Sequence, residues 1–215
     1  FDMQKQYASQ FPSLPATETL YTSNINDTIV KDFILRVKPD LVVVSGTSLL
    51  RKNILEVDVN MINLHTGLSP YVKGAPNCTN WCISTGDFHL IGNTIMWIDA
   101  GIDSGDIIAT SLVPLIGSES LSEVHVKVME HAHTLYIDAI ESLVMGIYNR
   151  VKQDSIASGK TYYSKDWNMA AKRKLLLNFK RMKSYINSER YLTQQKDLVL
   201  INPLQGYKQL SEDGR

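Results

Sequence analysis

Three side chains with complementary chemistry stand in the middle of the chain: Asn63, His65 and Asp103. An amide can donate to a developing oxyanion, an imidazole can exchange a proton near neutral pH, and a carboxylate can orient that imidazole. Together these groups can polarise a carbonyl and move a proton. Taken alone, however, a turn-capping asparagine, a hydrogen-bonded histidine and a turn aspartate are the more common explanation of such residues.

The predicted elements bring these residues together. Residues 59–65 alternate roughly and run into the turn-rich stretch 66–70, so we expect a strand that ends at His65. Side chains two positions apart on a strand point to one face, which would place Asn63 and His65 on the same side. A second strand is predicted at 92–99, shortly before Asp103, because it is rich in β-favouring side chains.

The remaining elements alternate between helix and strand. Helical spacing predicts a helix at 26–37, and the continuous β-branched run at 41–44 is typical of a buried parallel strand. A short helix is expected at 76–85 and a long one at about 121–149. We therefore predict an α/β fold with a mainly parallel, Rossmann-like sheet flanked by helices, in which ligands bind beyond the carboxyl ends of strands.

Two features define the boundaries of the long helix and of the region that follows it. Ser120 and Glu123 form a capping box at its start. After Arg150 we expect a linker at 153–165 and then a short α+β appendage, with a basic helix at 169–183 and a strand at 197–201. The predicted organisation is thus a catalytic domain, residues 1–150, and a C-terminal extension, residues 151–215.

Charge is divided unevenly between these two parts. Residues 1–150 carry 9 Lys and Arg against 16 Asp and Glu, and residues 151–215 carry 13 against 6. A basic extension could meet an anionic substrate or nucleic acid, although a run such as 172–174 is more commonly a solvated helix face. The apolar residues of the extension would pack internally or form a homodimer face; they are Leu175, Leu176, Leu177 and Phe179.

Composition excludes several classes of protein. The 215 residues are 44% apolar with ordinary Gly, Pro and Cys usage and no long apolar run, which excludes collagen-like, disulfide-rich and membrane-spanning chains. Cys78 and Cys82 stand four apart in a predicted helix, so we expect reduced thiols that pack, no metal site and a cytoplasmic protein. No secretory signal opens the chain, although an upstream segment before Phe1 stays open.

Two linked motifs carry a family resemblance. The first is Asn-x-His followed by Leu-x-Pro-x-x-x-Gly, at residues 63–74. The second is a Gly-x-Thr strand that leads to Gly-Ile-Asp-Ser-Gly-Asp-Ile-Ile, at residues 92–108. Over about residues 39–147 the chain resembles the 10-formyltetrahydrofolate-dependent formyltransferases, a family that includes sugar N-formyltransferases and the enzymes for methionyl-tRNA and glycinamide ribonucleotide.

The resemblance implies roles for specific residues. Asn63, His65 and Asp103 would be the catalytic trio, with Asn63 and a protonated His65 holding the oxyanion formed when an amine attacks the formyl carbon of 10-formyltetrahydrofolate. Asp103 would orient His65, and it or a water would accept the amine proton; no metal is required. Residues implied to line the pterin pocket are Thr47, Ser48, Leu49 and Leu50 and, further along, Ile98, Asp99, Ala100 and Gly101, where core packing is the alternative role for the Ile98 side chain.

Three departures from the family pattern stand out. Thr66-Gly67 replaces the more usual Pro-Ser or Ala-Ser after the histidine, and Met96 stands where several relatives have histidine. Only 62 residues precede Asn63, so the opening strand of the family and its loop are expected to be missing or abbreviated.

The acceptor favoured by the resemblance is the amino group of a nucleotide-linked amino sugar. Tyr162, Tyr163 and Trp167 could stack on its base, or pack the extension against the core. Methionyl-tRNA and glycinamide ribonucleotide are the alternative acceptors. Two alternatives from other classes are a formyltetrahydrofolate hydrolase, which would direct water onto the formyl group, and a non-catalytic folate- or nucleotide-binding module.

Overall fold

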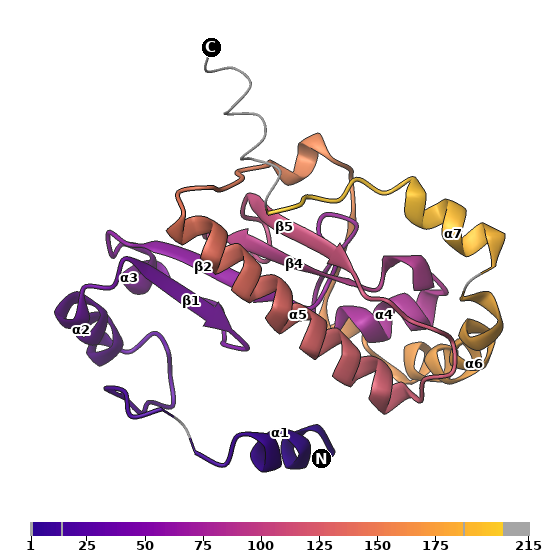
Figure 1. The fold of residues 1–215 in the computed structure, drawn as a ribbon, viewed down its shortest axis with the longest axis horizontal. Helices are drawn as coiled ribbons and strands as arrows, with labels where there is room; N and C mark the ends of the chain where they lie inside the picture. Colours follow the sequence, from indigo (N-terminus) through magenta and orange to yellow (C-terminus); the bar gives the residue numbers. More distant parts are fainter. Residues whose placement is uncertain (1, 14, 187, 204–215) are drawn as a thin grey trace.

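A four-stranded sheet forms the centre of the computed structural model, which describes residues 2–13, 15–186 and 188–203. Its strands lie in the order β1 (Leu41–Ser45), β2 (Asn60–His65), β4 (Gly92–Trp97) and β5 (Ile107–Leu112). The long helix α5 crosses one face of this sheet (Figure 1). The predicted α/β class is therefore confirmed.

Strand directions differ from the prediction of a mainly parallel sheet. In the described part of the chain, β1 and β2 are parallel, whereas β2 pairs antiparallel with β4 and β4 antiparallel with β5. The expectation of parallel strands was wrong for β4 and β5. Residues 98–106 turn the chain directly back from β4 into β5, whereas parallel neighbours need a crossover connection. All six residues of β4 are buried, as in a parallel strand that is covered on both faces, so burial does not reveal the direction of the strand.

Helices α1 (Asp2–Gln10), α2 (Thr28–Val37) and α3 (Lys52–Leu55) belong to the N-terminal part of the chain. α2 begins two residues later than predicted, after Asp27. Side chains of α2 and α3 pack with β1 in a hydrophobic cluster, whose buried members are Val30, Val44, Leu50, Ile54, Val57 and Met61.

Helix α5 (Leu121–Val144) buries its apolar stripe against the sheet. Its predicted capping box is confirmed: the Glu123 backbone N–H donates to Ser120 Oγ over 3.2 Å, and the Ser120 N–H donates to Glu123 Oε2 over 2.6 Å. The helix is five residues shorter than predicted because the chain turns at Gly146, whose φ is 75°. No helix among the described residues is long and apolar enough to cross a membrane.

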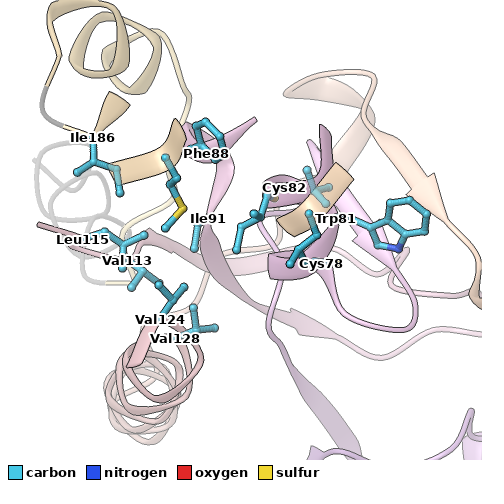
Figure 2. Close-up of a cluster of buried hydrophobic side chains, with 14 of the residues drawn as sticks. Cys78, Trp81, Cys82, Phe88, Ile91, Val113, Leu115, Val124, Val128 and Ile186 are labelled. Carbon is cyan, nitrogen blue, oxygen red and sulfur yellow. The ribbon is translucent and has the colours of Figure 1, made fainter. Parts of the chain in front are cut away.

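A second cluster of buried side chains joins the N-terminal part to the extension. It lies between helix α4 (Cys78–Thr85), the 3-10 turn η1 (Phe88–Leu90), α5, and helices α6 (Met169–Tyr185) and α7 (Glu189–Lys196). Figure 2 shows Cys78 and Cys82 among its apolar side chains. Both thiols are free and buried, as expected for packing residues.

Within the extension, residues 160–162 form a strand where a linker was expected. This strand, β6 (Lys160–Tyr162), pairs parallel with β3 (Val72–Gly74). Gly74 is needed here because its φ is 97° and a Cβ would lie 2.1 Å from the Tyr162 carbonyl oxygen. Two further 3-10 turns, η2 (Gln153–Ser155) and η3 (Ser164–Asp166), flank β6. The division at residue 150 stays a prediction.

The predicted strand at 197–201 is wrong. Helix α7 extends to Lys196, and residues 198–201 join none of the described strands. Instead, the Thr110 N–H donates to the Ile201 carbonyl over 2.8 Å, and the Ile201 N–H donates to the Thr110 hydroxyl over 2.7 Å. The basic helix predicted at 169–183 is confirmed as α6. Residues 1, 14, 187 and 204–215 of the predicted domains lie outside the described part.

Candidate active site

Strand β2 supplies two of the three predicted catalytic residues. Asn63 lies opposite Val44 of β1 and Met96 of β4, and His65 is the last residue of the strand. The sequence prediction that His65 ends a strand is thereby confirmed. Asn63 lines a cavity at this edge of the sheet, whereas His65 lies beside Asp103 and is not among the described residues that line the cavity.

Asp103 reaches the end of β2 from the turn that joins β4 and β5. Its φ of 49° lies in the left-handed region, which aspartate tolerates better than most residues. One carboxylate oxygen, Oδ1, is 3.5 Å from His65 Nδ1. The other, Oδ2, accepts a hydrogen bond from the Gly74 N–H over 3.1 Å. The structure thus brings the predicted imidazole and carboxylate together.

His65 lies between Asp103 and a cysteine. Its Nε2 is 3.5 Å from Cys78 Sγ, and its side chain is 10% exposed. Burial lowers the pKa of His65 below its ordinary value of 6.5, although the charge of Asp103 and a backbone hydrogen bond at Val72 oppose that change. This direction favours the neutral imidazole in the resting site, and the protonated His65 implied for the tetrahedral intermediate stays a prediction. Burial raises the pKa of Cys78 to about 12, so the thiol also stays neutral.

Gly67 makes room for this pair of side chains. A Cβ at position 67 would lie 2.4 Å from His65 Nε2 and 2.7 Å from Cys78 Sγ. Thr94 of β4 holds the loop in place, because its hydroxyl donates to the Gly67 carbonyl over 2.7 Å and accepts from the Ser69 N–H over 2.8 Å. The threonine of the Gly-x-Thr motif therefore fixes the loop that follows His65.

The cavity has a volume of about 300 Å³. Asn63 and Asp103 lie on its wall together with Met96 and Trp97 of β4. Seven of the eight residues predicted to line the pterin pocket also line it: Thr47, Ser48, Leu49, Leu50, Ile98, Asp99 and Gly101. Ala100 is not among the described residues that line the cavity, and its role in binding stays a prediction, like the roles of the others.

Hydrogen bonds shape both loops of the cavity wall. Asn26 donates to the Leu49 carbonyl over 3.0 Å and accepts from the Arg51 N–H over 2.6 Å, which ties loop 47–50 to the start of α2. On the other side, Asp99 Oδ1 accepts from the Gly101 N–H over 3.0 Å and from the Ser104 hydroxyl over 2.7 Å. Asp99, predicted as a pocket residue, thus also shapes its own loop, and Asn26 holds the other loop from a distant part of the sequence.

Residues of the extension and of β3 complete the surroundings of Asp103. Gln153 donates to the carbonyls of Asp103 and Gly105, both over 2.8 Å, and accepts from Lys73 Nζ over 3.1 Å. Sequence reasoning missed Gln153 and Lys73 because no local motif marks either residue. Among the described residues, no group of three or more His, Cys, Asp and Glu side chains is placed to hold a metal ion.

The aromatic residues considered for base stacking lie in different surroundings. Tyr162 is buried and stacks on Trp81 with ring centroids 4.4 Å apart, and Trp167 contacts the same ring edge-on at 4.8 Å. These two side chains pack the extension against the core, which was the alternative interpretation. Tyr163 is exposed.

The chain is similar in sequence to curated formyltransferases. Among curated proteins, the methionyl-tRNA formyltransferase of Clostridium novyi is 34% identical over 146 residues, which are 63% of this chain and 46% of that protein. The chain spans only 36% to 52% of the length of the first curated relatives that it matches.

Two solved structures share the fold. A 4-N formyltransferase from Francisella tularensis is similar with a TM-score of 0.58 and 22% identity, covering 83% of this chain and 74% of that one. A formyltransferase from Anoxybacillus kamchatkensis, crystallised with a UDP-linked formamido sugar and tetrahydrofolate, is similar with a TM-score of 0.53 and 21% identity, covering 67% and 85%. The model of the family described as formyl transferase matches residues 1–140. Since this match spans more than half of the chain, the protein belongs to the formyl transferase family.

Proposed function

We propose that the protein transfers a formyl group from 10-formyltetrahydrofolate to a primary amine. The observation that carries the proposal is the placement of the Asn63 amide and the Asp103 carboxylate on the wall of one cavity, with His65 directly beside Asp103. A hydrogen-bond donor and a proton acceptor thereby face the same space, which acyl transfer to an amine requires.

The cavity suits the pterin part of the donor. Its volume of about 300 Å³ is at the lower end of the range for small-molecule sites, so it would hold the ring system and leave the tail outside. Leu49, Leu50 and Ile98 offer apolar walls, and the backbone of residues 47–50 and 98–101 offers polar groups to the ring edge. This agreement supports the roles that the resemblance assigns to the two loops.

The reaction follows from the groups around the cavity. A neutral amine attacks the formyl carbon, and the Asn63 amide N–H donates to the oxyanion that forms. The attack forms a new C–N bond to the amine. The bond between the formyl carbon and N10 of the donor then breaks, and N10 leaves with a proton. Asp103, paired with the neutral imidazole of His65, accepts the proton that the amine loses and then gives this proton to N10 as that nitrogen leaves. His65 Nδ1 is 3.5 Å from Asp103 Oδ1, so the imidazole can stabilise this carboxylate, and its donation to the oxyanion is the role that the resemblance adds.

For the acceptor we favour a nucleotide-linked amino sugar. Solved structures of this fold include sugar N-formyltransferases, and one of them holds a UDP-linked formamido sugar together with tetrahydrofolate. A second cavity of about 470 Å³ lies beside the Asp103 loop, and Ser104 lines both cavities. Lys73 and Lys152 on its wall would pair with a diphosphate, and Asp106 and Asp154 on the same wall would bond sugar hydroxyls.

Methionyl-tRNA is the second candidate acceptor. Curated relatives of the chain include methionyl-tRNA formyltransferases from three Clostridium species. Helix α6 also exposes a run of cations at Lys172, Arg173 and Lys174, which would suit a phosphate backbone.

A direct assay tests the proposal. Purified protein is incubated with 10-formyltetrahydrofolate and, separately, with UDP- or dTDP-linked 4-amino sugars, methionyl-tRNA and glycinamide ribonucleotide, while tetrahydrofolate release is followed. Formylation of the amino sugar is expected. Turnover with methionyl-tRNA alone would move the assignment to the second candidate, and formate release without any amine would identify a hydrolase. Donor binding without turnover under all conditions would leave only a binding module and overturn the proposal.

A further inference from the structure

Gln153 lies in the extension, 50 residues after Asp103 in the sequence, and is 8% exposed. Its amide nitrogen donates to the backbone carbonyls of Asp103 and Gly105, each over 2.8 Å. Its amide oxygen accepts from Lys73 Nζ over 3.1 Å. A single buried side chain therefore uses both ends of its amide to join the Asp103 loop to β3.

Both segments that Gln153 joins also position the Asp103 carboxylate. The first is the loop that carries Asp103 itself, in a left-handed backbone conformation that needs support from its surroundings. The second is β3, where the Gly74 N–H, adjacent to Lys73, donates to Asp103 Oδ2. Gln153 thus holds the backbone of Asp103 directly. It also holds β3, the strand whose Gly74 N–H bonds to the Asp103 carboxylate.

The backbone around Gln153 is anchored independently of its side chain. Val151 and Ile107 exchange both backbone hydrogen bonds, over 2.8 and 3.1 Å, which attaches the start of the extension to β5. On the other side, the Lys160 N–H donates to the Tyr71 carbonyl over 3.0 Å. A change of the Gln153 side chain would therefore leave the path of the chain in place and act on the Asp103 loop.

We infer that Gln153 is a positioning residue that holds Asp103 at its working distance from His65. Gln153 lines the second cavity of about 470 Å³ but not the cavity that contains Asn63 and Asp103. We therefore assign its effect on the reaction to its hold on Asp103, and the acceptor KM distinguishes this effect from acceptor binding. The expected loss of kcat rests on the proposed formyl transfer. The expected change in the pKa of His65 does not depend on that function.

The test compares Gln153→Leu with Asn149→Leu. Both changes replace a hydrogen-bonded side-chain amide, which is buried in Gln153 and half-buried in Asn149. Asn149 donates to the carbonyls of Ile108 and Asn202, and not to the Asp103 loop. The first readout is kcat, together with the KM for the formyl donor and the KM for the acceptor; a change confined to the acceptor KM would overturn the inference. The second is the pH midpoint of the His65 imidazole, measured by NMR on protein with labelled histidine, which needs no activity.

We expect Gln153→Leu to lower kcat roughly ten- to hundred-fold with little change in the donor KM, because a shift of about 1 Å in a catalytic group has an effect of that order. The pH midpoint of His65 should fall, because a displaced Asp103 no longer favours the protonated imidazole, whereas Lys73 still disfavours it and Cys78 stays neutral. Asn149→Leu should reduce thermal stability and leave kcat and the His65 midpoint at their wild-type values.

Several outcomes would overturn the inference. One is the same kcat and the same His65 midpoint in the two leucine variants. Another is a rise in the donor KM with kcat unchanged. If Gln153→Leu does not fold, Gln153→Glu keeps the size of the side chain but turns an acceptor toward the two carbonyls, and the same loss of kcat is expected. If the wild-type protein transfers no formyl group, the proposed function fails, and the His65 midpoint alone decides this inference.

Discussion

The space beside His65 offers a sharp test of the geometry, through the substitution Gly67→Ala. The new methyl group would lie 2.4 Å from His65 Nε2 and 2.7 Å from Cys78 Sγ, whereas ordinary contacts begin near 3.4 Å. The imidazole must therefore move by about 1 Å. Overpacking of this kind typically reduces stability by about 1–3 kcal/mol. A displacement of about 1 Å in a catalytic group typically reduces the rate about a hundred-fold.

Urea denaturation and steady-state formyl transfer measure the two effects of Gly67→Ala. Gly146→Ala is the matched control, since Gly146 has a φ of 75° but no described atom within 4 Å of the place that a Cβ would take, so backbone strain alone would act there. Adding Cys78→Ala to Gly67→Ala removes the sulfur and should restore part of both losses, which a double-mutant cycle quantifies. Wild-type stability and wild-type kcat in Gly67→Ala would refute the packing argument.

Three further predictions concern Asn63, Tyr136 and His65. Asn63→Ala should lower kcat about a hundred- to a thousand-fold while the protein still binds the folate donor in a fluorescence titration; an unchanged kcat would remove Asn63 from the reaction. Tyr136→Phe should reduce the free energy of unfolding by about 1–3 kcal/mol, because the buried hydroxyl accepts from the Val44 N–H over 2.8 Å and donates to the Ile62 carbonyl over 3.0 Å. A loss below about 0.5 kcal/mol in urea denaturation would contradict this prediction. Since burial holds the pKa of His65 in the folded protein below 6.5, the unfolded chain takes up the proton first as the pH falls, and the free energy of unfolding should decline below about pH 6.5. His65→Gln should make that decline smaller. Equal pH dependence in the two proteins would contradict the assigned direction of the pKa shift.

Local patterns predicted the elements that carry the site. The capping box at Ser120 and Glu123 gave the start of α5, and the alternation before the turn at 66–70 gave the end of β2 at His65. Seven residues that line the cavity were implied instead by the family resemblance that the two motifs carry. These signals are local because each depends on residues that are neighbours in the sequence.

The features that sequence patterns missed depend on distant contacts. Burial of all six β4 residues hides whether the neighbouring strands are parallel or antiparallel. The apolar run at 198–201 has the composition of a strand, but it bonds to the backbone and hydroxyl of Thr110 instead of extending the sheet. Gln153 has no motif of its own, because its role exists only where the extension passes the Asp103 loop.

The hydrogen bonds between Gln153 and the Asp103 loop form late in synthesis, because the ribosome adds Gln153 well after Asp103. A ribosome that adds about 5–20 residues per second needs roughly 3–10 s to synthesise the 50 residues that separate Asp103 from Gln153. During that interval the nascent turn between β4 and β5 has none of the support that the glutamine provides. The candidate active site would therefore be completed late in biosynthesis, after the sheet itself has emerged.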